Sequence, residues 1–166
     1  VDAVRRCTNK DFKCEKIVIE KLKHFVSKEA FSIDGLGKKI IENFWSLNLI
    51  KYPQDIFRLD YKKIENLEGW GKLSSNNLKY SIDQARKISL NKFIFSLGIR
   101  HIGQENAKLI SNTLKTADNF FKLANNFKDD ALSNIDGIGQ VQINSIKDFF
   151  LEKENKKILN ELKKLL

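Results

Sequence analysis

Pairs of glycines that flank a single apolar residue recur along this chain, and they are its best candidates for binding chemistry. Three copies are intact, and in a fourth, His101-Ile102-Gly103, histidine replaces the first glycine; the intact copies are Gly35-Leu36-Gly37, Gly69-Trp70-Gly71 and Gly137-Ile138-Gly139. The second glycines are separated by 34, 32 and 36 residues. Such even spacing indicates an internal repeat.

Each copy predicts a tight hairpin between two helices. Glycine permits a positive φ angle or a close backbone approach, and the apolar residue between the glycines can turn inward onto the core. Apolar residues at helical spacing follow each hairpin: Ile40, Ile41, Phe44 and Leu47; Leu73 and Leu78; Ala107, Leu109, Ile110 and Leu114; Val141, Ile143, Ile146 and Phe149. The first turn of such a helix offers unpaired N–H groups and the positive end of the helix dipole to a phosphate. The repeats therefore predict sequence-independent binding to a nucleic acid backbone.

Two other interpretations remain open. A single hairpin of this kind is more often a structural turn that binds nothing, and we expect one or two of the four copies to be of that type. A period near 34 also fits a tetratricopeptide array, which would be a protein-binding scaffold. We rank the array interpretation lower, because such repeats do not need a glycine pair at each turn.

The composition suits a polyanionic partner. The 166 residues include 30 Lys and Arg against 21 Asp and Glu, giving a formal charge of +9 and a pI near 9.5. A lysine-rich composition can also follow from an AT-rich genome. The chain contains no apolar run of about 18 residues, so we expect no membrane span. It starts at Val1 and contains no methionine, from which we expect a piece of a longer protein.

The two cysteines could supply half of a metal site. Six residues stand between Cys7 and Cys14, and a structural zinc site needs four nitrogen or sulfur ligands. His24 and His101 do not complete a convincing set. We expect two free cysteines from these residues alone, with a disulfide less favoured in an intracellular protein.

The remaining patterns predict an all-α fold, because no alternation of period two occurs. Amphipathic helices are expected over residues 17–26, 53–59, 80–97 (with a new helix capped by Ser89), around 120–127 and over 152–166. We expect Asp34, Glu68 and Asp136 to cap backbone N–H groups at their turns rather than to bind a metal. Trp45 is assigned to the core, and Trp70, at a hairpin tip, is expected to be more open.

Several segments together resemble the NAD-dependent bacterial DNA ligases: Cys7-Thr8-Asn9 through Cys14, residues 24–30, residues 33–37 and residues 97–103. The resemblance covers essentially the whole chain. It implies the second half of a four-cysteine zinc finger at residues 1–16 and, over residues 17–166, tandem helix-hairpin-helix repeats, four motifs in two pseudo-paired units. The hairpins are then residues 33–38, 67–72, 99–104 and 135–140.

The resemblance implies that the parent enzyme seals nicks in duplex DNA during replication and repair, using NAD to adenylate a lysine. The chain contains no Lys-x-Asp-Gly, so we expect NAD to bind elsewhere and this segment to have no catalytic residue. We expect a monomer that acts on nicked double-stranded DNA in the bacterial cytoplasm, at the nucleoid. The matching DNA-binding positions are Gly35, Leu36, Gly37 and Lys38; Gly69, Trp70, Gly71 and Lys72; His101, Ile102, Gly103 and Gln104; and Gly137, Ile138, Gly139 and Gln140.

Cys7 and Cys14 match the third and fourth zinc ligands of that family, so zinc is expected only where the other half of the finger is present. The chain also departs from the family pattern. The cysteines are about one residue further apart, residues 15–17 differ, and bulky Ile41 and Ile143 stand where alanine is common. The alternative is a non-catalytic helix-hairpin-helix module of another repair complex, which binds DNA or protein.

Overall fold

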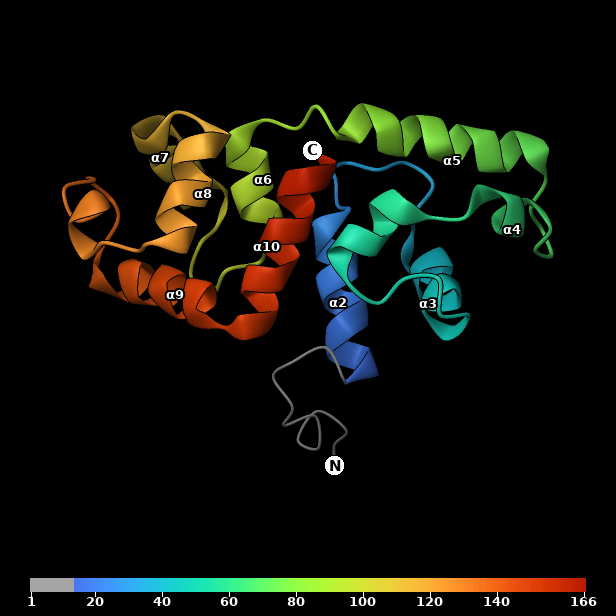
Figure 1. Cartoon of the computed structure of the whole chain (residues 1–166), viewed down its shortest axis with the longest axis horizontal. Helices are drawn as coiled ribbons and strands as arrows, with labels where there is room; N and C mark the ends of the chain where they lie inside the picture. The colour runs from blue at the N-terminus through green and yellow to red at the C-terminus, as the bar shows by residue number, and fades with distance from the viewer. Residues whose placement is uncertain (1–13) are drawn as a thin grey trace. The chain divides into compact units, whose positions relative to one another are not determined.

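The computed structural model describes residues 14–166, and every regular element in that range is helical (Figure 1). The all-α prediction with tandem helix-hairpin-helix repeats is therefore confirmed. None of the helices in this range is long and apolar enough to cross a membrane. The elements are α2 (Glu15–Phe25), α3 (Lys38–Ser46), the 3-10 helix η1 (Pro53–Arg58), α4 (Tyr61–Glu65), α5 (Lys72–Ala85), α6 (Leu90–Ser96), α7 (Gln104–Leu114), α8 (Ala117–Asn125), the 3-10 helix η2 (Asp129–Ala131), α9 (Gln140–Leu151) and α10 (Lys153–Leu165).

The chain folds into two compact units, each with two of the four hairpins. Unit 1 contains the described residues up to Lys28 together with Ser32–Lys87, and unit 2 contains Glu29–Phe31 and Ile88–Leu166. Hairpins 33–38 and 67–72 thus belong to unit 1, and hairpins 99–104 and 135–140 to unit 2. We call 33–38 and 99–104 the leading hairpins, and 67–72 and 135–140 the trailing hairpins, of their units.

The core of unit 1 is built around α2. Leu22 and Phe25 on its apolar face are at most 1% exposed, and the Phe25 ring packs edge-on against Phe57 of η1, 6.2 Å between centroids. Pro53 occupies the first turn of η1, where its missing N–H costs no hydrogen bond. The carboxylate of Asp55 accepts hydrogen bonds from the N–H groups of Lys51 and Tyr52, both at 2.9 Å, which fixes the start of this short helix.

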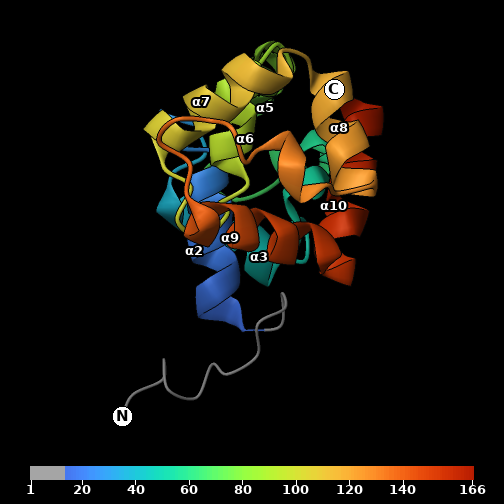
Figure 2. The ribbon, with the colours of Figure 1, turned by 90° about the vertical axis from the view of Figure 1, so that its left-hand side faces the viewer.

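Unit 2 is held by a cluster of phenylalanines. Phe120 of α8 lies between Phe93 of α6, at 5.9 Å, and Phe150 of α9, at 5.5 Å, with both ring pairs edge-on. Figure 2 shows the helices of this unit from the side. Thr116 caps α8 by accepting a hydrogen bond from the N–H of Asn119, at 3.1 Å. The cluster ties the helices around both hairpins of unit 2 to one core.

Leu73 and Val141 lie in helices, as their spacing predicts, and they are 75% and 56% exposed. Two other expectations from the sequence are wrong in detail. Trp45 is half-buried rather than a core residue. Ser89 does precede α6, as predicted, but its side chain makes no capping hydrogen bond.

Candidate nucleic-acid interface

The first residue of each hairpin pair has a left-handed backbone. Gly35, Gly69 and Gly137 have φ of +94°, +82° and +93°, and His101 has φ of +67°. A side chain is strained in this region, which explains glycine at three copies. The histidine copy keeps the same turn, and Asn106 Nδ2 donates a hydrogen bond to the carbonyl oxygen of His101, 3.0 Å away. All four copies are thus one backbone motif.

The apolar residue between the pair points inward in three copies. Leu36, Ile102 and Ile138 are 4–6% exposed, which confirms the expectation that this residue holds the turn on the core. Trp70 is only half-buried, and its ring lies against Phe44. In three hairpins the N–H of this residue also closes the turn on the carbonyl three residues earlier; these bonds are Trp70 to Leu67, Ile102 to Ile99 and Ile138 to Ile135, at 3.0–3.1 Å.

The second glycine has a different role from the first. Gly37, Gly71, Gly103 and Gly139 are the N-caps of α3, α5, α7 and α9, with negative φ values that any residue adopts. A Cβ atom added at the first three would meet no atom of residues 14–166 within 4 Å. Neither backbone conformation nor packing within this range therefore requires glycine there. The absent side chain leaves open space directly beside the start of α3, α5 and α7.

That open space faces unpaired hydrogen-bond donors. Across residues 14–166, the N–H groups of the first three residues of α3, α5, α7 and α9 have no acceptor, and none of these helices has a side-chain cap on those groups. In each helix the N-cap carbonyl instead accepts the first helical hydrogen bond, from the residue four positions later, at 2.9–3.1 Å. Each hairpin therefore presents the arrangement that binds an anion at a helix N-terminus.

The leading and trailing hairpins differ in one donor. In the trailing hairpins the glycine N–H is already used, by Ser74 Oγ for Gly71, at 3.0 Å, and by Gln142 Oε1 for Gly139, at 2.9 Å. In the leading hairpins the N–H groups of Gly37 and Gly103 have no acceptor within the described range. The leading hairpins thus offer one more donor to a ligand. Ser74 and Gln142 were missed from the sequence, although a polar residue three positions after an N-cap is a known capping signal.

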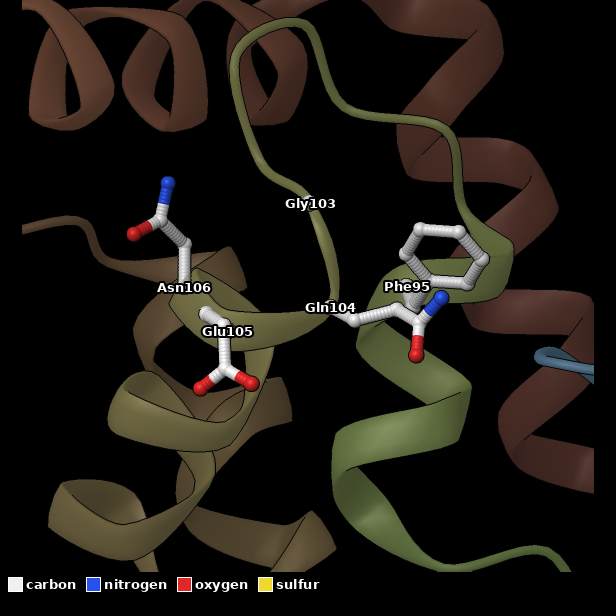
Figure 3. Close-up of a pocket in the computed structure, with 5 residues that line it drawn as sticks. All are labelled: Phe95, Gly103, Gln104, Glu105 and Asn106. Carbon is white, nitrogen blue, oxygen red and sulfur yellow. The ribbon is translucent and has the colours of Figure 1, made fainter.

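The side chains beside the donors are polar and exposed. Lys38, Lys72, Gln104 and Gln140 follow the second glycines and all lie on the surface. An open depression of about 610 Å³ adjoins the leading hairpin of unit 2, with Gly103 and the first turn of α7 on one side and Phe95 of α6 on the other (Figure 3). In the same figure the Gln104 side chain extends toward the Phe95 ring.

The acidic residues before the hairpins do not cap the turns. Asp34, Glu68 and Asp136 are exposed, and no hydrogen bond reaches their carboxylates from any residue of the described range, so the capping prediction is wrong. No three His, Cys, Asp or Glu side chains within residues 14–166 are close enough together to hold a metal ion.

The predicted zinc ligands are only partly described. Cys7 lies outside the described residues. Cys14 is the N-cap of α2 and takes part in a disulfide, so the expectation of a free thiol is wrong at this position.

Residues 92–159 match the family described as the helix-hairpin-helix motif. The chain is 66% identical to a DNA ligase of Pelagibacter ubique over 165 residues, which are 99% of this chain and 24% of that protein. It is 43% identical to a DNA ligase of Parvibaculum lavamentivorans over 175 residues, and 45% identical to one of Wolbachia pipientis over 161 residues. These cover 98% and 95% of the chain, and 24% of each relative. The chain is homologous to one segment of DNA ligases.

The chain spans about a quarter of the length of the curated relatives it matches. The matched motif family covers both hairpins of unit 2, and the two hairpins of unit 1 share the same backbone geometry.

Proposed function

We propose that this DNA ligase segment binds the sugar-phosphate backbone of duplex DNA through its four hairpins, without reading the base sequence. The observation that carries the proposal is glycine at all four N-caps, at three of which nothing in the described part of the chain requires it. A ligand that approaches the backbone closely would require it. The unpaired donors at the same place indicate that the ligand is an anion.

The charge of the units supports a nucleic acid partner. The described part of unit 1 carries 14 Lys and Arg against 9 Asp and Glu, and unit 2 carries 12 against 10. Unit 1 should therefore contribute more of the salt-dependent affinity, because each phosphate neutralised by a cation releases counterions. The donors of the leading hairpins should hold phosphates more firmly than those of the trailing hairpins, because each has the additional glycine N–H.

We further propose that the parent protein is an NAD-dependent ligase that seals nicks in replication and repair, as the resemblance of its motifs implies. In that scheme NAD and the adenylated lysine belong to other parts of the protein, and this segment holds the duplex around the nick. The segment would act within a monomeric enzyme at the bacterial nucleoid. A structural zinc ion would require Cys14 as a thiolate and ligands beyond residues 14–166.

The test is to replace Gly37 or Gly103 by serine. Serine is at least as good an N-cap as glycine, and both positions have backbone angles that serine adopts, so the free energy of unfolding should stay within about 0.5 kcal/mol of the original value. The hydroxyl would fill the open space, and its oxygen would accept hydrogen bonds from the N–H groups that are otherwise available to the phosphate. Affinity for a short duplex, measured by fluorescence anisotropy at low salt, should fall about three- to tenfold for each variant.

Thr116→Ser is the matched control, since it also places serine at a helix N-cap, but before α8, which follows no hairpin. It should leave affinity unchanged. If both glycine variants bind the duplex as tightly as the control, the hairpins do not hold the phosphates. Several base sequences should give the same affinity, on nicked and on intact duplex, because the hairpins are proposed to contact only the backbone.

A further inference from the structure

The trailing hairpin of each unit carries an exposed aliphatic side chain at the same position. Leu73 is 75% exposed and Val141 is 56% exposed, and each lies two residues after the N-cap glycine, in the first turn of α5 or α9. In the leading hairpins this position holds Lys39 and Glu105, both exposed and charged.

The fold does not explain these two side chains. α5 buries Ser75, Leu78 and Ile82, and α9 buries Ile143, Ile146 and Phe150. Leu73 and Val141 therefore lie outside the faces that pack into their own cores. Exposed aliphatic residues are common singly, but here two occupy equivalent places in two different units. An equivalent place beside an equivalent set of donors points to one common ligand.

The N–H donors at the trailing hairpins indicate which part of the ligand lies beside them. Ser74 and Gln142 already accept hydrogen bonds from the N–H groups of Gly71 and Gly139, so the trailing hairpins offer fewer donors to a phosphate. They present an apolar side chain in addition. The neighbouring Lys72 and the positive charge of unit 1 fit the polyanionic strand. Successive nucleotides of a strand are about 3.4 Å apart along the duplex, so a phosphate at the remaining donors places its own sugar within reach of a side chain in the same turn.

We propose that Leu73 and Val141 pack against the deoxyribose rings of the bound strand and thereby select DNA over RNA. This inference rests on the proposed binding of the backbone by the hairpins. The C2′ atom of deoxyribose carries only hydrogens and can be covered by an aliphatic group without loss. Ribose carries a hydroxyl there, which would lose its water and find no hydrogen-bond partner on leucine or valine. The preference comes from the sugar and is independent of base sequence.

The experiment compares two ligands, a DNA duplex and an RNA duplex of the same sequence, for the 166-residue chain. The original chain should bind the DNA duplex about tenfold more tightly than the RNA duplex. Leu73→Ala and Val141→Ala should each weaken DNA binding about threefold and reduce the preference for DNA, without changing the slope of log affinity against log salt. The RNA duplex also differs in groove shape, but that difference is common to all variants, so the change in preference isolates the side chain.

Leu151→Ala is the matched control, because Leu151 is 61% exposed on the same helix as Val141 but at its far end. It should change neither affinity nor preference. Val141→Ile, which keeps the apolar contact, should retain the preference for DNA. If Leu73→Ala and Val141→Ala leave the preference for DNA unchanged while the original chain still binds with a steep salt dependence, the inference is overturned and the proposed function stands. If the original chain binds no duplex at low salt, the proposed function itself has failed.

Discussion

The ring of Trp70 lies 5.6 Å from the ring of Phe44, centroid to centroid, with the planes tilted by 36°. Trp70 is at the tip of hairpin 67–72, and Phe44 is on α3, the helix that follows hairpin 33–38. A Cβ on Gly35 of the latter hairpin would lie 3.7 Å from Leu78 Cδ1 on α5. Each hairpin of unit 1 thus lies against the helix that follows the other, and this reciprocal packing fixes the two sets of unpaired N–H donors relative to each other.

We predict that Trp70→Ala destabilises unit 1 by about 2 kcal/mol, less than a fully buried aromatic residue would cost, because Trp70 is only half-buried. Urea unfolding followed by the fluorescence of Trp45, which is also in unit 1, measures the loss. Trp70→Phe keeps a ring against Phe44 and should cost about half as much. A free energy of unfolding within about 0.5 kcal/mol of the original for Trp70→Ala would mean that this ring contact does not hold the hairpin.

The two glycines of a hairpin should respond differently to substitution. We predict that Gly137→Ala lowers the free energy of unfolding by about 1–3 kcal/mol, because φ is +93° and the new Cβ would lie 2.8 Å from Leu109 Cδ1. The leucine can move its far end, so the backbone conformation supplies most of the cost. Gly69→Ala, with φ of +82° and no atom near its Cβ, isolates the backbone part.

Gly103→Ser is the control for this pair, because its φ of −90° suits any residue and its Cβ would be in open space. Thermal unfolding followed by circular dichroism should give the order Gly103→Ser, Gly69→Ala, Gly137→Ala from most to least stable. An equal loss for all three would show that the left-handed backbone of the first position is not what requires glycine.

The repeat itself could be predicted from the sequence, because a left-handed turn favours glycine and the glycines recur at even spacing. His101 could be recognised as the fourth copy for the same reason: its neighbours Ile102 and Gly103 keep the pattern, and a hydrogen bond from Asn106 supports the turn. The inward direction of Leu36, Ile102 and Ile138 followed from their apolar character.

Periodicity could not show which apolar residues remain on the surface. Leu73 and Val141 fit the helical spacing, yet both lie in the first turn of their helix. The buried face of that helix is formed by residues later in α5 and α9. The distinct roles of the two glycines in each pair could be seen only in the structure. A glycine that makes room for a ligand and a glycine that permits a left-handed turn are the same letter in the sequence. Whether Cys14 is a free thiol or part of a disulfide depends on which groups lie near its sulfur, and the separation of the cysteines in the sequence does not determine this.

The lysines that follow the second glycines of unit 1 should meet phosphates. We predict that Lys38→Ala and Lys72→Ala each reduce the slope of log affinity against log salt by about one unit, equally for all base sequences. Titrations at several salt concentrations measure the slope. Lys157, exposed on α10 and remote in sequence from any hairpin, is the control, and its change to alanine should leave the slope unaltered. Lys163 is less suitable, since its Nζ lies 5.7 Å from the Phe121 ring and contributes to packing.

The stability of unit 1 should fall at high pH because of Tyr61. Burial, together with the nearby Asp83 carboxylate, raises the pKa of the Tyr61 phenol to about 12, against an effect of Arg86 in the opposite direction. The folded chain therefore keeps this proton more tightly than the unfolded chain, whose tyrosine has a pKa near 10. By linkage, the contribution of Tyr61 is complete below pH 10 and is lost as the pH rises through 12.

The prediction is that thermal stability declines less steeply between pH 10 and 12 in Tyr61→Phe than in the original chain, because phenylalanine has no proton to lose. Lysines also titrate in this range, so the difference between the two proteins is the informative quantity. Tyr80→Phe, at a position that is 67% exposed, should behave as the original chain does. Ultraviolet absorbance of the phenolate should show an ionisation step near pH 12, and that step should be missing in Tyr61→Phe. Parallel pH profiles for the original chain and Tyr61→Phe would instead place the phenol in contact with solvent, outside the packing of α4 against α5.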